Sequence, residues 1–407
     1  MSKSHTIFRY LSLLGGSYLL MFFSGSFTSI RGTLLPMIMD HFNISYSAGG
    51  LMFLCVIVPG MLGSLSAGYL FSHFNKKLVL IGGVSIIGVS TALMPISPGY
   101  VFFLACTVIF SYGLTMTITS GNITTSDIFD AVLPKYKENG INMVHFAFSI
   151  GALIPLFLLS IPAAWPGGWQ PPFIMLSFVP LLILGLISVS RYPDVEKERT
   201  VPGRREYVRA LADPQLRRYL LIVICYAGTE AGLVNWLPTY IQDARHLGTA
   251  AASRVMLLFF VFFTGGRFIG TMVIQKFNRH RLFLFLAVMM AVCLSGSLVF
   301  HIMPFGIELL LPVSGFFFAL VFPIFQMNLI EDFRHMLGSA TSLLFTSSTA
   351  GITIVPFLIG VGNDIFGVQN GLLLTLATTA AMFPLYFGIL RHKRKHVRSL
   401  EPAITTV

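Results

Sequence analysis

Charged residues are scarce in this chain of 407 residues, where Asp, Glu, Lys and Arg together make up 11%. This share is far below that of soluble globular proteins, so the composition excludes an ordinary soluble domain. Hydrophobic residues make up 55% of the chain, and the mean hydropathy is +0.79. Since a helix of about 20 apolar residues crosses a bilayer, the chain is long enough for about twelve spans. We therefore expect a multi-pass protein embedded in a lipid bilayer.

Cysteine is also rare, and the sequence has only Cys55, Cys106, Cys225 and Cys293. Each falls within an apolar stretch, without the clustered His or carboxylate residues that a zinc site needs. We expect free thiols that pack as small hydrophobic side chains, and no metal site.

Several functional motifs are missing from the sequence. It has no Walker loop, no dinucleotide-binding fingerprint and no set of residues for covalent catalysis. We therefore expect no enzymatic activity, no cofactor and no direct use of ATP. The first apolar run is too long for a cleavable signal peptide, and it lacks a cleavage site of small residues.

Acidic residues are outnumbered, with 16 Asp and Glu against 27 Lys and Arg. The excess does not indicate a nucleic-acid partner, because the basic residues gather in short connections between apolar runs. Such connections face the cytoplasm in membrane proteins. They lie at 76–77, 135–137, 197–218, 279–281, 334 and 391–395. We therefore expect both termini to be cytoplasmic, in a bacterial inner membrane.

Polar residues, Gly and Pro divide the chain into twelve apolar stretches. The predicted spans are residues 9–38, 47–72, 77–97, 100–127, 140–164, 170–191, 218–242, 250–276, 280–302, 305–330, 337–361 and 368–390. The polar stretch near the middle of the chain predicts a linker. The predicted organisation is a six-helix half at 1–191, a cytoplasmic linker at 192–217, a second six-helix half at 218–391 and a cytoplasmic tail at 392–407.

The two halves share a sequence repeat. Residues 63–76 align without gaps with residues 266–279, at an offset of 203. Because six helices return the chain to the same side of the membrane, the two repeats run parallel. Such repeats place a substrate site between the halves, near the bilayer midplane.

Short motifs of the chain resemble those of a known transporter family. Residues 63–77 resemble a degenerate form of the loop signature of the major facilitator superfamily, with Ser72, His73 and Asn75 where it prefers Asp, Arg and Gly. Further motifs resemble, in order and spacing, the fucose and glucose/mannose:proton symporter family of that superfamily. These motifs are residues 31–36, 226–230, 235–238, 266–270 and 321–323.

The resemblance implies an all-α fold of twelve transmembrane helices in two halves. It also implies sugar transport by proton symport, in which a monosaccharide is taken up by alternating access. Polar residues on the first, fourth, seventh and tenth helices would contact the sugar. The family usually carries acids near positions 32 and 118, where this chain has Gly32 and Ile118.

Glu230 lies deep inside the seventh predicted span. A carboxylate near the bilayer centre costs several kcal/mol, so it usually faces a bundle interior and marks a substrate or proton path. Arg31 lies in the first span, which faces the seventh in this fold, and an Arg31–Glu230 ion pair is the prediction that we favour. Three roles for Arg31 stay open: a structural ion pair, coupling to protons or substrate, and direct binding of an anionic substrate.

Polar residues in three spans are the candidates for substrate binding. Asn122 is central in a hydroxyl-rich stretch of the fourth span, although such hydroxyls often bond back to their own helix. Asn235 and Trp236 follow Glu230 by five and six residues, so at least one lies near its face of the helix. In the tenth span, Gln326 and Asn328 point about 200° apart, and we expect only one of them to meet the cavity.

Three more residues have predicted roles. His145, in the fifth span, titrates near neutral pH and is a candidate proton relay, with a hydrogen-bonded structural histidine as the alternative. Arg267, near the end of the eighth span, and Asp127, at the end of the fourth, are the predicted gating residues.

We predict a monomeric secondary transporter for proton-coupled uptake of a small polar solute. An efflux or organic-anion carrier of the same fold is the alternative, favoured by Arg31 and by the missing acids.

Overall fold

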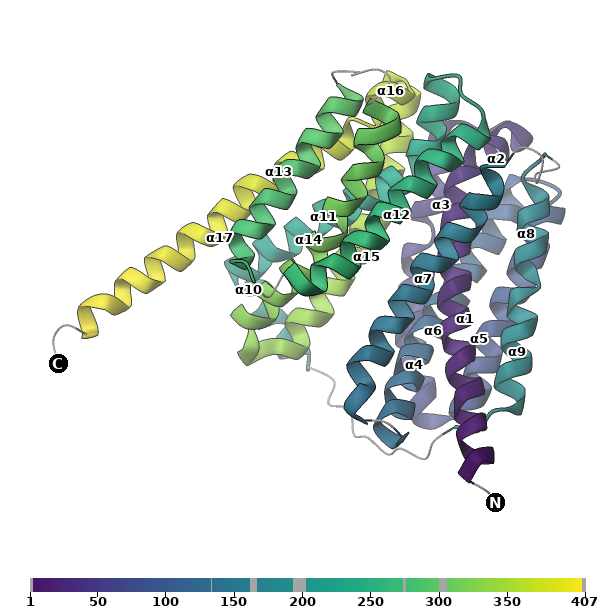
Figure 1. Cartoon of the computed structure of the whole chain (residues 1–407), viewed down its shortest axis with the longest axis horizontal. Coiled ribbons are helices and arrows are strands. Elements are labelled where there is room, and N and C mark those ends of the chain that lie inside the picture. The colour runs from purple at the N-terminus through teal and green to yellow at the C-terminus, as the bar shows by residue number, and fades with distance from the viewer. Residues whose placement is uncertain are drawn as a thin grey trace. The chain divides into compact units, whose positions relative to one another are not determined.

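The computed structural model describes residues 3–132, 134–161, 167–192, 203–273, 276–299 and 306–404. Within these ranges every regular element is helical (Figure 1). This confirms the predicted all-α class.

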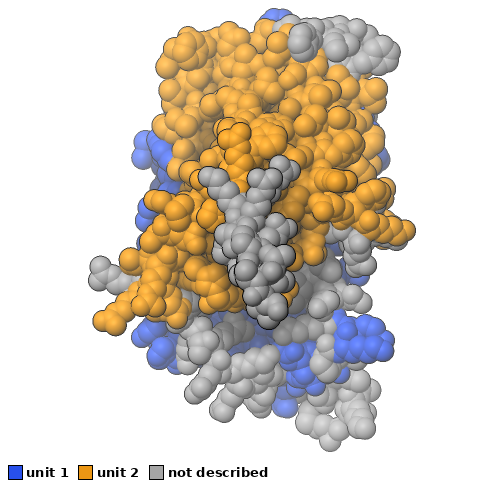
Figure 2. Space-filling model, turned by 90° about the vertical axis from the view of Figure 1, so that its left-hand side faces the viewer, with its two compact units in different colours: residues 1–198, 234–260 blue, residues 199–233, 261–407 orange. Residues whose placement is uncertain are grey.

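Contacts divide the chain into two compact units (Figure 2). Unit 1, shown in blue, comprises residues 1–198 and 234–260, and unit 2, shown in orange, comprises 199–233 and 261–407. Helices α11 (Pro214–Thr239) and α12 (Thr249–Val273) each contribute residues to both units.

The helices before the predicted linker all belong to unit 1. They are α1 (Lys3–Thr33), α2 (Leu35–Phe42), α3 (Tyr46–Leu54), α4 (Ile57–His73), α5 (Lys76–Leu93), α6 (Tyr100–Val132), α7 (Lys137–Leu159), α8 (Gln170–Ser177) and α9 (Val179–Val189). In this unit α1 lies beside α7 and α9 (Figure 1).

Unit 2 begins within the predicted linker, of which residues 193–202 lie outside the described part of the chain. Besides its shares of α11 and α12, its helices are α10 (Arg204–Ala212), α13 (Arg279–Leu298), α14 (Leu311–Asp332), α15 (Leu337–Phe366), α16 (Val368–Gly371) and α17 (Leu374–Ile404). Short π-helical turns occupy Tyr240–Ala244 and Gly306–Leu310.

Eleven stretches of the described residues are long and apolar enough to cross a membrane. A shorter apolar helix, Phe146–Leu159, falls within the predicted fifth span. In order along the chain, the eleven stretches and this shorter helix overlap the twelve predicted spans.

Three of the predicted spans contain a break that the hydropathy pattern did not predict. The breaks separate α1 from α2, α3 from α4 and α8 from α9. Each lies two to four residues before a proline: Pro36, Pro59 or Pro180. Because proline has no N–H group, the carbonyl four residues earlier loses its helical partner, and the helix ends or bends there.

Glycines allow close helix packing at corresponding places in the two units. In unit 1, a Cβ atom at Gly25 of α1 would lie 2.0 Å from the carbonyl oxygen of Phe148 in α7. In unit 2, a Cβ atom at Gly351 of α15 would lie 2.4 Å from the carbonyl oxygen of Ile224 in α11, and 3.0 Å from the backbone nitrogen of Gly228. Gly25 and Gly228 are 203 residues apart, which is the offset of the sequence repeat.

Candidate functional site

Glu230 lies on the side of α11 that faces away from α15. The α15 contact is made by Gly228 and Gly232, where a Cβ atom would lie 2.3 Å from Val355 and 2.6 Å from Ile359. Residues two positions apart on a helix point about 200° apart, so Glu230 points away from this contact. Its side chain is partly exposed.

Tyr226 lies one helical turn before Glu230 and on the same face of α11. The carboxyl group of Glu230 and the hydroxyl group of Tyr226 are close enough to interact electrostatically. The same hydroxyl group donates a hydrogen bond of 2.8 Å to the carbonyl oxygen of Phe318 in α14. The Tyr226 ring is buried and packs against the rings of Phe318 and Phe322, each with a centroid distance of 6.1 Å. Tyr226 therefore joins α11 to α14 one helical turn before Glu230.

Arg267 provides a positive charge that interacts electrostatically with Glu230. Its place on α12 is set by Gly266, where a Cβ atom would lie 2.7 Å from the carbonyl oxygen of Phe316 in α14. The guanidinium group lies over the ring of Phe263, 4.4 Å from its centroid, in a cation–π contact. The predicted gating residue is thus close to the predicted coupling residue.

We call Tyr226, Glu230, Arg267 and the Phe318 carbonyl group the Glu230 cluster. All four belong to unit 2. Ionised Glu230 has a cation nearby, and protonated Glu230 has a hydroxyl group with which to share its proton. The carboxyl group therefore has a nearby polar group that can interact with either protonation state. No role for Tyr226 was predicted from the sequence, although its spacing of four residues from Glu230 is a signal for such a pair.

The two predicted amides of α14 differ in burial. Gln326 is partly exposed, whereas Asn328 is 2% exposed, and its Nδ2 atom has no hydrogen-bond partner among the described residues. A buried amide without a partner costs free energy, so Asn328 is the stronger candidate for a further polar contact.

Arg31 lies in the last turn of α1, in unit 1. Its guanidinium carbon is 4.8 Å from the ring centroid of Phe53 and 5.8 Å from that of Phe27. Its Nε atom is buried and has no hydrogen-bond partner among the described residues. The predicted Arg31–Glu230 pair would join residues of different units, and it stays a prediction.

Trp236 contacts the same aromatic ring as Arg31. The indole is fully buried and meets the rings of Phe53 and Tyr46, each with a centroid distance of 6.2 Å. The neighbouring Asn235 is also buried. The structure thus brings Arg31, Asn235 and Trp236 into one region of unit 1.

Gly32 explains why an acid is missing from the first span. A Cβ atom at this position would lie 2.6 Å from the carbonyl oxygen of Val234 and 3.3 Å from the Cα atom of Asn235. No larger side chain fits without moving the backbone of α11. The close packing of α1 on α11 therefore leaves no room at this position for the acid that the family resemblance implies.

Some hydroxyl groups of α6 bond to their own helix, whereas those of Ser120 and Thr125 are buried without a hydrogen-bond partner among the described residues. Thr115 donates to the carbonyl oxygen of Ser111 at 2.9 Å, and Thr124 donates to that of Ser120 at 2.7 Å. These hydroxyls fit the alternative in which they satisfy the helix backbone. Asn122 is exposed, and its predicted contact with substrate stays a prediction.

The remaining predicted residues also lie in unit 1. His145 falls in α7, but its side chain lies outside the described part of the structure. Asp127 is buried near the end of α6, where its Oδ2 atom accepts a hydrogen bond of 3.0 Å from Tyr192 and lies 3.6 Å from Nζ of Lys76. Asp127 is therefore held by a cation and a hydroxyl group, and its gating role stays a prediction.

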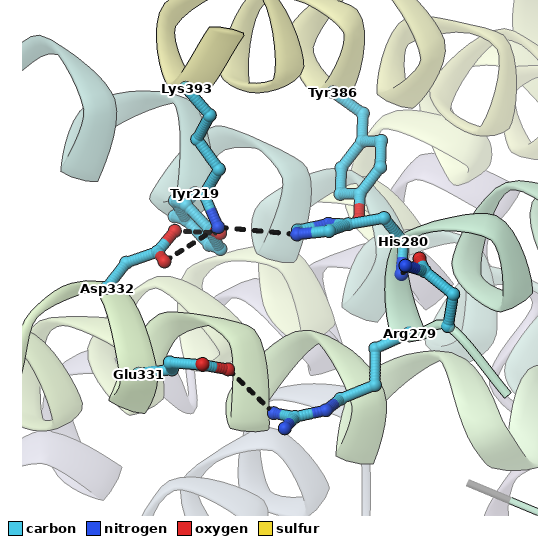
Figure 3. A network of polar contacts seen from close by, with 8 residues as sticks. Tyr219, Arg279, His280, Glu331, Asp332, Tyr386 and Lys393 are labelled. Carbon is cyan, nitrogen blue, oxygen red and sulfur yellow. Dashed lines mark hydrogen bonds and ion pairs between the residues drawn. The ribbon is translucent and has the colours of Figure 1, made fainter. Parts of the chain in front are cut away.

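A second polar cluster joins four helices of unit 2, and we call it the Asp332 cluster (Figure 3). Its side chains are Tyr219, Arg279, His280, Glu331, Asp332, Tyr386 and Lys393. Asp332 lies 2.7 Å from Nζ of Lys393 and accepts a hydrogen bond of 2.7 Å from Tyr219. Arg279 and Glu331 form a neighbouring ion pair of 2.9 Å. This cluster was not predicted from the sequence.

The Asp332 cluster has a counterpart in unit 1. Lys76 and Arg279 are 203 residues apart, and each follows an asparagine whose side chain caps the helix, Asn75 or Asn278. Lys76 contacts an acid at the end of α6, and Arg279 contacts an acid at the end of α14. The ion pairs therefore follow the repeat that the sequence alignment predicts.

Known proteins match the chain over most of its length. The model of the Major Facilitator Superfamily matches residues 17–356. The MFS-type transporter YceJ of Bacillus subtilis is 24% identical over 83% of this chain and 87% of its own. The glucose/galactose transporter of Brucella abortus is 22% identical over 92% of this chain and 93% of its own. The solved structure of the fucose:proton symporter FucP of E. coli is 19% identical, covers 94% of this chain and 99% of its own, and has a TM-score of 0.60. These matches confirm the resemblance and the fold predicted from the motifs, and the chain belongs to the Major Facilitator Superfamily of multi-pass membrane transporters.

Proposed function

We propose that the protein is a secondary active transporter that couples proton movement to the uptake of a small polar solute, such as a monosaccharide. The observation that carries this proposal is the Glu230 cluster, in which a carboxyl group inside a membrane-spanning helix lies near a hydroxyl group and a cation. Carboxyl groups inside membrane spans are costly, and they commonly bind and release the coupled proton.

Glu230 suits proton coupling because its charge changes when it binds or releases a proton. The positive charge of Arg267 favours the ionised form, and the hydroxyl group of Tyr226 lies near the carboxyl group. A ligand drives a conformational change only when it binds one state more tightly than the other. A proton does so if the surroundings of Glu230 differ between the two access states.

The sugar part of the proposal rests on polar and aromatic groups and on the named relatives. Asn235 supplies an amide for hydroxyl groups, and Trp236 an aromatic face for the apolar side of a sugar ring. The relatives named above include a glucose/galactose transporter and a fucose:proton symporter.

Transport by the purified protein tests this proposal. Proteoliposomes with the protein should accumulate radiolabelled D-glucose or D-galactose when the outside is made acidic, and a protonophore should abolish the accumulation. If both sugars only equilibrate under an imposed pH gradient, proton-coupled uptake of these sugars is wrong.

An organic-anion carrier is the second candidate, and Arg31 is the observation that favours it. Its Nε atom is buried without a hydrogen-bond partner, and its guanidinium group lies on two phenylalanine rings. A planar guanidinium group binds carboxylates and phosphates well. A thermal-shift screen of the purified protein against sugars, carboxylates and hydrophobic amines separates the two candidates.

Other parts of the prediction also stand as proposals. The basic connections favour cytoplasmic termini in a bacterial inner membrane. The sequence patterns also support four further proposals. They are a functional monomer, half boundaries at residues 191 and 218, a gating role for Asp127 and a proton-relay role for His145. Labelling of single cysteines introduced near the two termini, in intact cells and in opened membranes, tests the orientation.

A further inference from the structure

The imidazole ring of His280 contacts a polar group of α17 through each of its two nitrogen atoms (Figure 3). Its Nε2 atom lies 3.3 Å from Nζ of Lys393, and its Nδ1 atom lies 2.7 Å from the hydroxyl oxygen of Tyr386. A lysine ammonium group can only donate hydrogen bonds, so Nε2 accepts and carries no proton. The ring is therefore neutral, and its one proton is on Nδ1 and directed at Tyr386.

Both partners of the imidazole ring are held in place by other contacts. Tyr386 is fully buried, and its ring stacks on that of Phe283 in α13 with a centroid distance of 4.1 Å. The ammonium group of Lys393 lies 2.7 Å from Oδ1 of Asp332 in α14. The imidazole ring therefore lies between two positioned groups of α17 and joins α13 to that helix.

The charges around His280 balance only while its ring is neutral. Among the described residues, the charged side chains that interact with it are Arg279 on its own helix, Glu331 and Asp332 on α14, and Lys393 on α17. They form two ion pairs, Arg279–Glu331 and Lys393–Asp332. Protonation of the ring adds a third cation without a third carboxylate. It also places an N–H group at Nε2, so the hydrogen bond from Lys393 is lost and two like charges face each other.

We infer that His280 is a pH-sensitive contact between α13 and α17, which is intact while the ring is neutral and broken when the ring is protonated. At high pH, Lys393 is shared between Asp332 and His280. As the pH falls and the ring gains a proton, Lys393 leaves His280 and keeps Asp332 alone. The end of α17 is then held to α14 but no longer to α13 through this lysine.

The place of His280 in the chain gives this contact a regulatory role, which rests on the proposed function and orientation. His280 and Lys393 lie in the basic connections at 279–281 and 391–395, which we place in the cytoplasm. A proton symporter that works in uptake releases its protons on this side. The contact would therefore respond to the acidification that transport itself produces.

Hydrogen exchange of α17 tests the inference without a known substrate. Full-length protein in nanodiscs is compared from about pH 5.5 to 8, a range that spans the ordinary titration of histidine. After correction for the intrinsic pH dependence, amides of residues 386–393 should exchange about three to ten times faster at the acidic end, as expected for one lost hydrogen bond.

Two variants should remove this pH step. His280→Gln should keep the slow rate at every pH, because the amide oxygen can accept from Lys393 and does not gain a proton in this range. Lys393→Met should show no step, because its side chain has neither the donor nor the charge that the protonated ring repels.

His392→Gln is the matched control, because His392 is an exposed histidine of the same helix and precedes Lys393 directly. This variant should keep the step. Equal exchange at all pH values in the wild type overturns the inference, and so does a step that persists in His280→Gln or disappears in His392→Gln. Glu230→Gln tests the proposed function separately. If it accumulates sugar like the wild type while the wild-type step is present, the pH-sensitive contact stands and the proposed proton coupling fails.

Discussion

Arg31 and Trp236 contact the same ring, that of Phe53, with distances of 4.8 Å from the guanidinium carbon and 6.2 Å from the indole centroid. The two residues come from helices α1 and α11, and both belong to unit 1. A cationic group and an indole are therefore held against the same phenylalanine ring. This relationship makes Arg31 the residue that best separates the two candidate substrate classes.

The first prediction concerns Arg31. If the substrate is an anion, Arg31→Gln should weaken its binding by about 10- to 100-fold, because a charge-assisted hydrogen bond is lost. Arg31→Lys should not restore full affinity, since an ammonium group lacks the planar fork. If the substrate is a neutral sugar, its affinity should change less than about threefold in Arg31→Gln. Calorimetry with the ligand found by the thermal-shift screen measures both cases.

The second prediction concerns the close packing at Gly32. Gly32→Ala should lower the free energy of unfolding by about 1–3 kcal/mol, because the new methyl group meets the Val234 carbonyl oxygen. Gly32→Asp should cost more, since it also buries a charge. Gly82→Ala is the control, because a Cβ atom there meets nothing within 4 Å, and it should be neutral or stabilising. A Gly32→Ala variant with wild-type thermal stability would show that α1 and α11 are not packed this closely.

The third prediction concerns the exposed amide of Asn122. Asn122→Ala should weaken sugar binding by about 1–3 kcal/mol if the amide bonds a ligand hydroxyl group that is left unpaired without it. Thr115→Ala is the matched control on α6, because the Thr115 hydroxyl group bonds to its own helix. Calorimetry with the transported sugar should show no loss of affinity for this control. If Asn122→Ala also binds the sugar with wild-type affinity, the sugar does not contact Asn122.

The fourth prediction compares two neighbouring acids of the Asp332 cluster. Asp332→Asn should lower the free energy of unfolding by about 1–2 kcal/mol, because both Tyr219 and Lys393 lose a charged partner in a partly buried place. Glu331→Gln should change it by less than about 1 kcal/mol, since its pair with Arg279 is exposed. Thermal unfolding in the same detergent measures both, and the reverse order would contradict the assignment of Asp332 as the centre of the cluster.

Most of the helical organisation could be predicted from the sequence, because each span needs about 20 apolar residues and shows this directly in its composition. The breaks before Pro36, Pro59 and Pro180 could have been predicted from the missing N–H group of proline. Glu230 was identifiable as an isolated carboxyl group in an apolar stretch. These features depend on one segment at a time.

The contacts of Glu230 could be predicted only in part. Tyr226 lies four residues away on the same helix, so the sequence carries a signal for that pair. Arg267 and Phe318 lie on other helices, and their positions depend on the close packing of Gly266 against α14. Hydropathy does not determine how two helices rotate against each other. The sequence indicated Arg31 as the cation for Glu230, which stays a prediction, but it did not indicate that Arg267 interacts with Glu230 within unit 2.

The most direct test of the account is energised transport by Glu230→Gln in proteoliposomes. The amide keeps the shape and hydrogen bonding of the side chain but cannot bind and release a proton. With an imposed pH gradient, the variant should fail to accumulate radiolabelled sugar, while sugar exchange without a gradient should continue. Glu331→Gln, which removes an exposed carboxyl group of the same unit, should accumulate sugar like the wild type. Accumulation by Glu230→Gln to the wild-type level would contradict the role of Glu230 in proton coupling.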